Sequence, residues 1–476
     1  MTVRLNPLIA TALVGIGSVV TVAMSVVTMK IYALLVGPSG IGIFALLQSI
    51  LSLSIIAASL GLQASTIALV ASADRRAGRG ESHIVGRTAI MVAAVTGGTG
   101  AVGLLLLSTP IAETILGSAG WRADVAILAP TLLFTVVATV GAAVLAGLQR
   151  LRIATGVTVI TAAAAAAAGI AFVASFGIGG FAPSLVVAAL VQIALTLYAV
   201  KRVGLSLLRR PLSVARHAVR ELIALGAPVA LSQAVSTGAL MIVPVLVFQS
   251  RGAADVGYYR AAAAISIGMG AFFTAGIHQD FLPRMAAAHE SERAVLVERR
   301  MRIVIGIGMP AILAILALGP AILDVLYTDE FHPAIAVLQW QLIGDLVRLP
   351  ALVLAFSALA IYSPRAYFAI EAVGGLTLVL GTVLGLAVVG LAGPGIGYAA
   401  AQLATYVVAW IVIGRRIHAI PGRLQGVVGT VLLAASLVLL TDPSAVARLL
   451  IFGTAAIGTA AISWPRLIRL HRASEL

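Results

Sequence analysis

The feature that most constrains this chain is a series of long apolar runs that recurs from one end of the sequence to the other. The clearest example is residues 29–61, where two apolar stretches flank a turn at residues 37–40 and Lys30 is the only charge. Proline and glycine at this turn stop one helix and allow the next to begin at once. Runs of this length without a two-residue alternation are typical of membrane-spanning helices rather than of a membrane β-barrel.

The composition agrees with a membrane protein. Hydrophobic residues make up 61% of the chain and charged residues only 10%, whereas a soluble domain carries about 25% charged residues. We therefore predict an all-α integral membrane protein.

A membrane span needs about 20 apolar residues. On that basis the sequence predicts about fourteen transmembrane helices, at residues 8–36, 41–72, 86–109, 123–147, 153–176, 180–200, 219–249, 255–283, 302–327, 333–361, 366–391, 395–414, 424–441 and 446–465.

The basic residues lie in alternate connections between these predicted helices. Arg75 and Arg76 follow the second helix and Lys201 and Arg202 the sixth, while the opposite connections hold few basic residues and some acidic ones such as Glu113. The positive-inside rule places the basic connections in the cytoplasm, so both termini are predicted to be cytoplasmic. The net charge of +14 is then a sign of topology, with some attraction for anionic lipid headgroups, and not of nucleic-acid binding.

Glycines recur at a fixed separation and indicate an internal repeat. Gly37 and Gly252 are 215 positions apart, as are Gly42 and Gly257. Each repeat contains six predicted helices, and because six is even, the two repeats have the same orientation in the membrane. The predicted organisation is an N-terminal six-helix bundle at residues 1–213, a C-terminal six-helix bundle at 214–418, and two additional helices with a cytoplasmic tail at 419–476.

The sequence contains no recognisable catalytic constellation. Its seven histidines have no metal-ligand spacing, and it lacks a Walker loop and a Gly-x-Ser-x-Gly motif. The chain has no cysteine, which excludes disulfides and thiol chemistry. We expect a protein that is not an enzyme and that holds no metal and no cofactor.

Charges inside the predicted spans are the main candidates for function, because a charge in the hydrocarbon costs about 3 kcal/mol or more. Lys30 and Arg260 lie near the outer ends of the first and eighth helices. They are candidates for a cationic site that binds an anionic headgroup, although either side chain can instead extend to the interface. Arg348, near the middle of the tenth helix, is a third candidate for substrate contact. Asp345 lies three residues earlier on the same face, so an internal ion pair is the favoured interpretation of Arg348, and contact with a substrate or an ion is the alternative.

Other polar residues in the spans are candidates for cavity contacts or ion coupling. Glu371 is a candidate proton carrier if it is buried, and otherwise a residue near the interface. Asp345 is a second ion-coupling candidate. Glutamines in a cavity can bind sugar hydroxyls, but they equally join one helix to another. The cavity candidates of this kind are Gln48, Gln63 and Gln233.

The first hairpin resembles a known family. Residues 30–42, K-I-Y-A-L-L-V-G-P-S-G-I-G, resemble the opening hairpin of bacterial polysaccharide flippases of the Wzx type, and residues 46–49 and 59–62 continue the likeness. Residues 280–284, D-F-L-P-R, are similar to the end of the eighth helix in that family. The helix layout is shared with multidrug exporters of the same superfamily, the multidrug/oligosaccharidyl-lipid/polysaccharide exporters, and with the lipid II flippase.

This resemblance implies a fold of two six-helix bundles in a V around a central cavity, working by alternating access. It implies transport of an undecaprenyl-pyrophosphate-linked oligosaccharide from the cytoplasmic to the periplasmic leaflet of the bacterial inner membrane, for O-antigen or exopolysaccharide assembly. Lys30 and Arg260 fit the family's cationic contacts to the pyrophosphate. The implied partners are this lipid-linked glycan, membrane lipids and the polysaccharide polymerase or export machinery.

Two other functions compete with this one. A multidrug or small-molecule antiporter of the same fold needs an acidic cavity for cationic drugs, whereas the candidate cavity residues here are mainly basic. A membrane glycosyltransferase or polymerase usually needs a large outer loop with catalytic residues, and the predicted outer loops are all short. The sequence therefore favours an anionic lipid substrate, and it does not identify the sugar or the driving ion.

Overall fold

The computed structural model describes residues 7–76, 78–205, 216–277, 281, 284–285, 288–361, 364–414, 453, 455 and 457. Helices dominate these residues, and no strand occurs among them. The chain forms two compact units, Met1–Met241 and Ile242–Leu476. The predicted domain boundary at residue 213 and the predicted helices 424–441 and 446–465 fall outside the described residues, apart from residues 453, 455 and 457.

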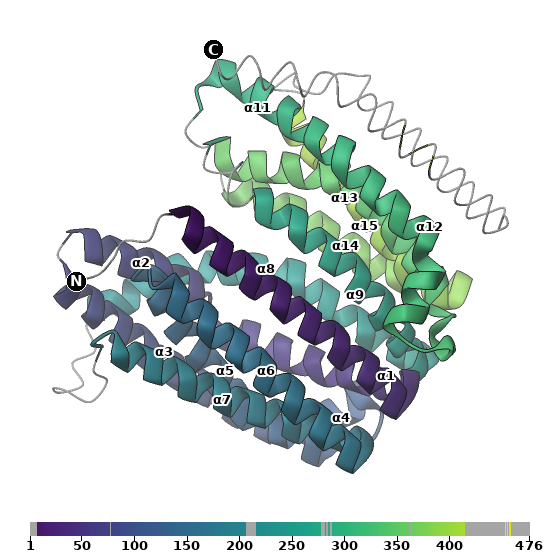
Figure 1. Ribbon diagram of the computed structural model, residues 1–476, viewed down its shortest axis with the longest axis horizontal. Helices are drawn as coiled ribbons and strands as arrows, with labels where there is room; N and C mark the ends of the chain where they lie inside the picture. The colour runs from purple at the N-terminus through teal and green to yellow at the C-terminus, as the bar shows by residue number, and fades with distance from the viewer. Residues whose placement is uncertain are drawn as a thin grey trace. The chain divides into compact units, whose positions relative to one another are not determined.

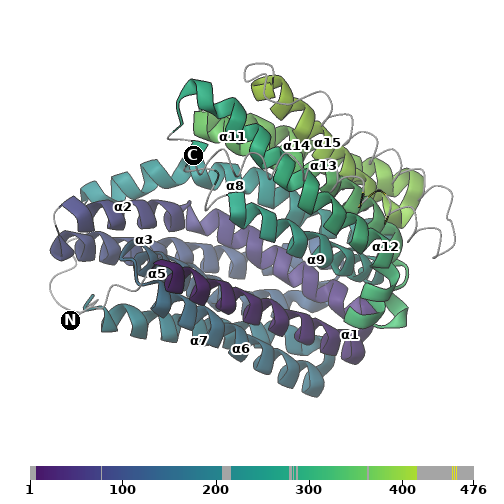
Figure 2. The same ribbon diagram turned by 45° about the horizontal axis from the view of Figure 1, so that its top comes forward.

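The first unit is a layered bundle in which α5 packs on α3, α2 and α7, while α6 packs on α1 and α7. Figures 1 and 2 show its long helices running side by side. Its elements are α1 (Pro7–Ser59), α2 (Leu62–Arg76), α3 (Arg79–Leu106), α4 (Ser108–Leu116), η1 (Ala119–Trp121), α5 (Arg122–Gly147), α6 (Leu151–Phe176), η2 (Gly177–Gly180), α7 (Phe181–Arg202) and most of α8 (Arg216–Arg251).

The long helix α1 is two helices that fold back on each other at Gly37. Gly37 has φ 61° and ψ −167°, a non-helical conformation followed directly by Pro38. The rings of Tyr32 and Phe44, on either side of this residue, have centroids 5.5 Å apart. In one continuous helix these two positions would be about 18 Å apart along the axis. The hairpin predicted around residues 37–40 is therefore present, with a single glycine as its turn.

The prediction of one continuous helix at residues 41–72 is wrong. The chain leaves the helical conformation at Leu60 and Gly61, which have φ values of 47° and 69°, and α2 begins at Leu62. The cause is a close approach by α8. A Cβ on Gly61 would lie 2.0 Å from the carbonyl oxygen of Gly226. Only glycine allows two backbones to meet so closely at a positive φ.

The second unit is built around α13, which packs on α9, α12, α14 and α15. In the most apolar part of α13, 83% of the residues are buried. This helix therefore forms the core of the unit. The elements of the unit are the end of α8, α9 (Ala253–Gly276), α11 (Glu290–Ile303), η4 (Val304–Gly308), α12 (Met309–Leu326), η5 (Asp329–Phe331), α13 (Ala334–Ile361), α14 (Pro364–Val389), η6 (Gly390–Ala392), α15 (Gly393–Ala409) and η7 (Trp410–Gly414).

Backbone conformations repeat between the two units. Gly252, which precedes α9, has φ 90° and ψ −178°, close to the values at Gly37. Gly177 after α6 and Gly390 after α14 have φ values of 58° and 65°. The order of helices from α5 to α7 matches the order from α13 to α15. The landmark pair Gly37 and Gly252 thus coincides with turns that need positive φ, whereas Gly42 and Gly257 lie within the helices that follow these turns.

Eight segments of the described chain are long and apolar enough to cross a membrane. Three of them, with 40, 51 and 49 residues, each contain one of the glycine turns at Gly37, Gly177 or Gly390. As straight helices they would be about 60–77 Å long, about twice the thickness of the hydrocarbon core or more. Each therefore contains two crossings. The predicted all-α, multi-pass membrane fold is confirmed, and each of the twelve predicted spans up to residue 414 overlaps helical residues of the described chain, although 41–72 is broken at Leu60 and Gly61.

Candidate functional site

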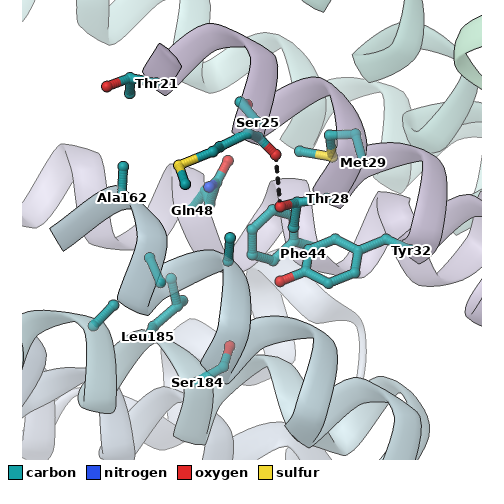
Figure 3. A pocket seen from close by; sticks show the side chains of 14 residues that line it. Thr21, Ser25, Thr28, Met29, Tyr32, Phe44, Gln48, Ala162, Ser184 and Leu185 are labelled. Atoms are coloured by element: carbon teal, nitrogen blue, oxygen red, sulfur yellow. Dashed lines mark hydrogen bonds between the residues drawn. The ribbon is translucent and has the colours of Figure 1, made fainter. Parts of the chain in front are cut away.

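A cavity of about 220 Å³ opens in the first unit, among α1, α6 and α7 (Figure 3). The hairpin at Gly37 is what brings its walls together, because lining residues come from both parts of α1. The lining residues are Thr21, Met24, Ser25, Thr28, Met29, Tyr32, Phe44, Gln48, Ala162, Ala165, Ala166, Ser184, Leu185 and Ala188.

One wall of this cavity is a rigid aromatic cluster. Tyr32 meets Phe44 and Phe181 edge to face, with centroids 5.5 and 5.1 Å away, and Phe44 and Phe181 are 4.7 Å apart. The Tyr32 hydroxyl lies against Gly169 of α6, where a Cβ would be only 1.8 Å from the oxygen. The alanines that precede Gly169 leave space on the same side. Small residues on α6 therefore create the cavity, and the three rings hold its shape.

The cavity has polar groups but no charge. The hydroxyls of Thr21 and Thr28 donate hydrogen bonds to the carbonyls of Gly17 and Met24, at 2.9 and 2.8 Å, which leaves their oxygen lone pairs available as acceptors. Gln48 adds an amide to the lining. None of the lining residues is acidic or basic. Such a lining suits neutral groups with hydroxyls and apolar faces, and it offers no counter-ion to a cation.

A second candidate site is a buried polar network in the second unit. Asp345 of α13 is 2% exposed. One of its carboxylate oxygens accepts a hydrogen bond from Ser266 of α9 at 2.6 Å, and the other accepts from Tyr398 of α15 at 2.8 Å. Arg348 Nη1 lies 3.6 Å from Asp345 Oδ1 and donates to the Tyr398 hydroxyl at 3.2 Å. The predicted Asp345–Arg348 ion pair is therefore present.

The network continues to α14 through Glu371. The charge of Arg348 acts on Glu371 as well as on Asp345, and Tyr367 shares a hydrogen bond with Glu371. Gly270 of α9 makes room for the guanidinium, because a Cβ there would lie 2.3 Å from Nη1. Arg348 thus forms an ion pair with Asp345, and its charge also acts on Glu371.

Arg260 lies in another part of the second unit. It is half-buried in the second turn of α9, and its charge acts on the hydroxyl of Tyr327, which follows α12. Tyr327 in turn packs on Phe331 with ring centroids 4.9 Å apart. Arg260 is therefore set in an aromatic surrounding near the end of the bundle.

The remaining candidates lie apart from both sites. Lys30 is half-buried on α1 between Met29 and Ile31, and it does not line the cavity. Gln63 of α2 and Gln233 of α8 are exposed within their unit. The sequence missed Ser266, Tyr367 and Tyr398. A hydroxyl inside a predicted span was the only signal for them, and many hydroxyls in these helices bond instead to their own backbone.

A comparison with models of protein families identifies the family of this chain. A family model described as "Polysaccharide biosynthesis protein" matches residues 31–336, more than half of the 476-residue chain. The chain belongs to the polysaccharide biosynthesis protein family. No curated protein matches it at a significant level of sequence similarity.

Solved structures show which fold this family member adopts. The lipid II flippase MurJ, in an inward closed conformation, matches with a TM-score of 0.74 and 11% identity over 97% of this chain and all of that one. An inward-facing multidrug resistance MATE transporter of the MOP superfamily matches with a TM-score of 0.70 and 16% identity, over 84% of this chain and 95% of that one. The Vibrio cholerae MATE transporter VcmN gives a TM-score of 0.60 and 16% identity, with 86% and 95% covered.

These matches establish the fold of the polysaccharide biosynthesis protein as that of the MOP-superfamily transporters and flippases. The family match and this fold agree with the predicted resemblance to polysaccharide flippases of the same superfamily. The identities are low, so the substrate does not follow from them.

Proposed function

We propose that this protein is a flippase that moves an undecaprenyl-pyrophosphate-linked oligosaccharide from the cytoplasmic to the periplasmic leaflet of a bacterial inner membrane. The observation that carries the proposal is the combination of a polysaccharide biosynthesis family match with a fold shared by a lipid II flippase over nearly the whole chain. The glycan would serve O-antigen or exopolysaccharide assembly. Both termini would be cytoplasmic, as the distribution of basic residues indicates.

The physical problem for such a flippase is the pyrophosphate, because a charged headgroup does not cross hydrocarbon without a partner. Lys30 and Arg260 are the proposed cationic contacts, since each is a half-buried positive charge on a spanning helix. The neutral cavity beside Gln48 would hold sugar rings, with hydroxyl and amide hydrogen bonds and an aromatic wall. Gln63 and Gln233 remain proposals for further glycan contacts.

The internal repeat suggests how the proposed transport cycle is organised. The two repeated bundles, residues 1–213 and 214–418, would rock against each other to open alternately to each side of the membrane. Residues 419–476 would add two helices to this core. Membrane lipids and the polysaccharide polymerase or export machinery are the expected partners.

A multidrug or small-molecule antiporter is the second candidate, because MATE transporters share the fold. A cationic drug needs a carboxylate where it binds, and the cavity of the first unit has none in its lining. A glycosyltransferase or polymerase is the weaker alternative, since none of the structural neighbours named above is an enzyme.

Complementation in the native host tests these functions. Deletion of the gene is expected to remove surface glycan and to leave lipid-linked oligosaccharide on the inner leaflet. The wild-type gene is expected to restore surface glycan and to clear the accumulated intermediate. Lys30→Ala and Arg260→Ala are expected to lower surface glycan at least ten-fold at equal protein levels. Lys30→Arg, which keeps the charge, and Arg122→Ala, which removes an exposed arginine at the start of α5, are the controls.

A second pair of variants tests the cavity in the same assay. Ala166→Leu places a large side chain into the cavity lining, whereas Ala167→Leu adds the same side chain to the next residue, which is exposed and outside the lining. Only the first is expected to reduce surface glycan. Normal surface glycan in the deletion strain together with increased sensitivity to cationic drugs would overturn the flippase proposal and favour the antiporter.

A further inference from the structure

A second cavity in the first unit, of about 480 Å³, lies among α1, α3, α4 and α5, and we call it the α3–α4 cavity. Its lining includes Ser54, Ala57, Gly100, Gly103 and Ile111. For comparison, an apolar cavity of about 150 Å³ in another protein binds one benzene molecule. The α3–α4 cavity therefore has room for a long hydrocarbon chain.

The sequence creates this cavity by a break in a helix and by small side chains. Pro110 has no backbone N–H, so a continuous helix would lack the bond from this position to the carbonyl of Leu106, where α3 ends. After the break, α4 packs mainly on α5 and only lightly on α1 and α3. Ala57, Gly100 and Gly103 leave space below α4. A Cβ on Gly103 would meet no atom within 4 Å.

The polar groups of the α3–α4 cavity are already engaged with the backbone of their own helices. Ser54 donates its hydroxyl hydrogen to the carbonyl of Ile50 at 2.8 Å. Thr99 donates in the same way to the carbonyl of Thr96 at 2.9 Å. None of the lining residues carries a charge or an amide side chain. The cavity thus offers no side-chain donor to a phosphate or a sugar, and its chemistry suits hydrocarbon.

The surroundings of the α3–α4 cavity indicate what fills it. In the most apolar part of α3 only 33% of the residues are buried. Val102 and Leu106, beside lining residues on the same helix, are 55% and 77% exposed. Exposed apolar side chains on a spanning helix meet the lipid chains of the bilayer. A void beside them would forfeit dispersion contacts on one side, so a chain that enters the void is favoured.

We propose that the α3–α4 cavity is a lipid-binding site that holds one acyl chain of a membrane phospholipid. Phospholipids are the main lipids of a bilayer, and polyprenyl lipids are a minor component. The lining has no charged group that would select a particular headgroup, so mass action favours the abundant lipid. The bound chain would supply the contacts that α4 lacks toward α1 and α3. This inference goes beyond the proposed function and holds for any cargo.

Lipid binding to the purified, delipidated full-length protein in detergent tests the proposal, with palmitoyl-oleoyl phosphatidylethanolamine as the probe. Native mass spectrometry measures its occupancy, and thermal unfolding measures its effect on stability. Gly103→Leu places an alkyl side chain in the cavity and is expected to weaken binding about ten-fold or more, which is 1.4 kcal/mol in binding free energy. Gly98→Leu is the matched control, since Gly98 is on the same helix, is equally unobstructed and lies outside the lining.

The unfolding midpoints separate a bound lipid from structural damage. The probe is expected to raise the midpoint of the wild type and of Gly98→Leu, but not that of Gly103→Leu. Without lipid, Gly103→Leu is expected to be at least as stable as the wild type, because leucine fills the void and favours the helix more than glycine does.

A second variant keeps the proposal falsifiable if Gly103→Leu folds poorly. Ala57 is an exposed residue of the lining on α1, and Ala57→Leu is expected to weaken binding of the probe as well. Binding by both cavity variants as tight as that of Gly98→Leu would overturn the proposal. So would a polyprenyl lipid that the wild type retains in place of a phospholipid and that the cavity variants lose, because the cavity would then belong to the substrate.

Discussion

At the residue scale, the contact of Tyr32 with Gly169 determines the shape of the cavity in the first unit. Tyr32 is 4% exposed and is held by the rings of Phe44 and Phe181, so it cannot move aside when a methyl group is added at Gly169. We expect Gly169→Ala to destabilise the protein by about 1–3 kcal/mol, the usual range for overpacking. Thermal unfolding of the purified protein in detergent would show this as a lower midpoint.

The matched control lies on the same helix. A Cβ added at Gly156 of α6 would meet no atom within 4 Å, so Gly156→Ala is expected to be neutral or to stabilise the helix by up to about 1 kcal/mol. Equal midpoints for Gly169→Ala and Gly156→Ala would show that Tyr32 is free to move and that the aromatic wall is not rigid.

At the element scale, the turn at Gly252 joins α8 to α9 and depends on backbone conformation alone. A Cβ at Gly252 would meet no atom within 4 Å, but φ 90° with ψ −178° is a region that only glycine populates readily. We expect Gly252→Ala to cost about 1–3 kcal/mol. Gly268 of α9 is equally unobstructed and has no positive φ, so Gly268→Ala should not destabilise. Similar unfolding midpoints for the two variants would contradict a strained turn.

The elements also show why part of the structure was predictable. Helix positions follow from hydropathy, and the turns at Gly37 and Gly252 follow from the glycines that interrupt the apolar runs, because both depend on residues close together in sequence. The break at Leu60–Gly61 depends instead on Gly226, a residue far along the chain. The same limit applies to the polar network. Asp345 and Arg348 are three residues apart and were predicted as a pair, whereas Ser266 and Tyr398 reach Asp345 from 79 and 53 residues away.

At the scale of the whole molecule, the repeat and the charge distribution make a prediction about topology that the fold alone does not test. Between the end of α4 and the first residue of α5 there is one basic residue, Arg122, whereas the segment that includes α11 carries several, among them Arg293 and Arg299. If the positive-inside rule holds, the first connection is periplasmic and the second cytoplasmic. A parallel repeat requires this same alternation in both halves.

The absence of cysteine makes the measurement direct, because each introduced cysteine is the only thiol in the chain. Ala119→Cys and Ser291→Cys are both exposed positions at the ends of helices. A membrane-impermeant thiol reagent applied to intact spheroplasts is expected to label Ala119→Cys fully and Ser291→Cys only after permeabilisation. The reverse labelling pattern would show that the protein has the opposite orientation in the membrane. In that case the charge distribution would no longer support both termini being cytoplasmic, and the proposed direction of transport, from the cytoplasmic to the periplasmic leaflet, would lose this argument.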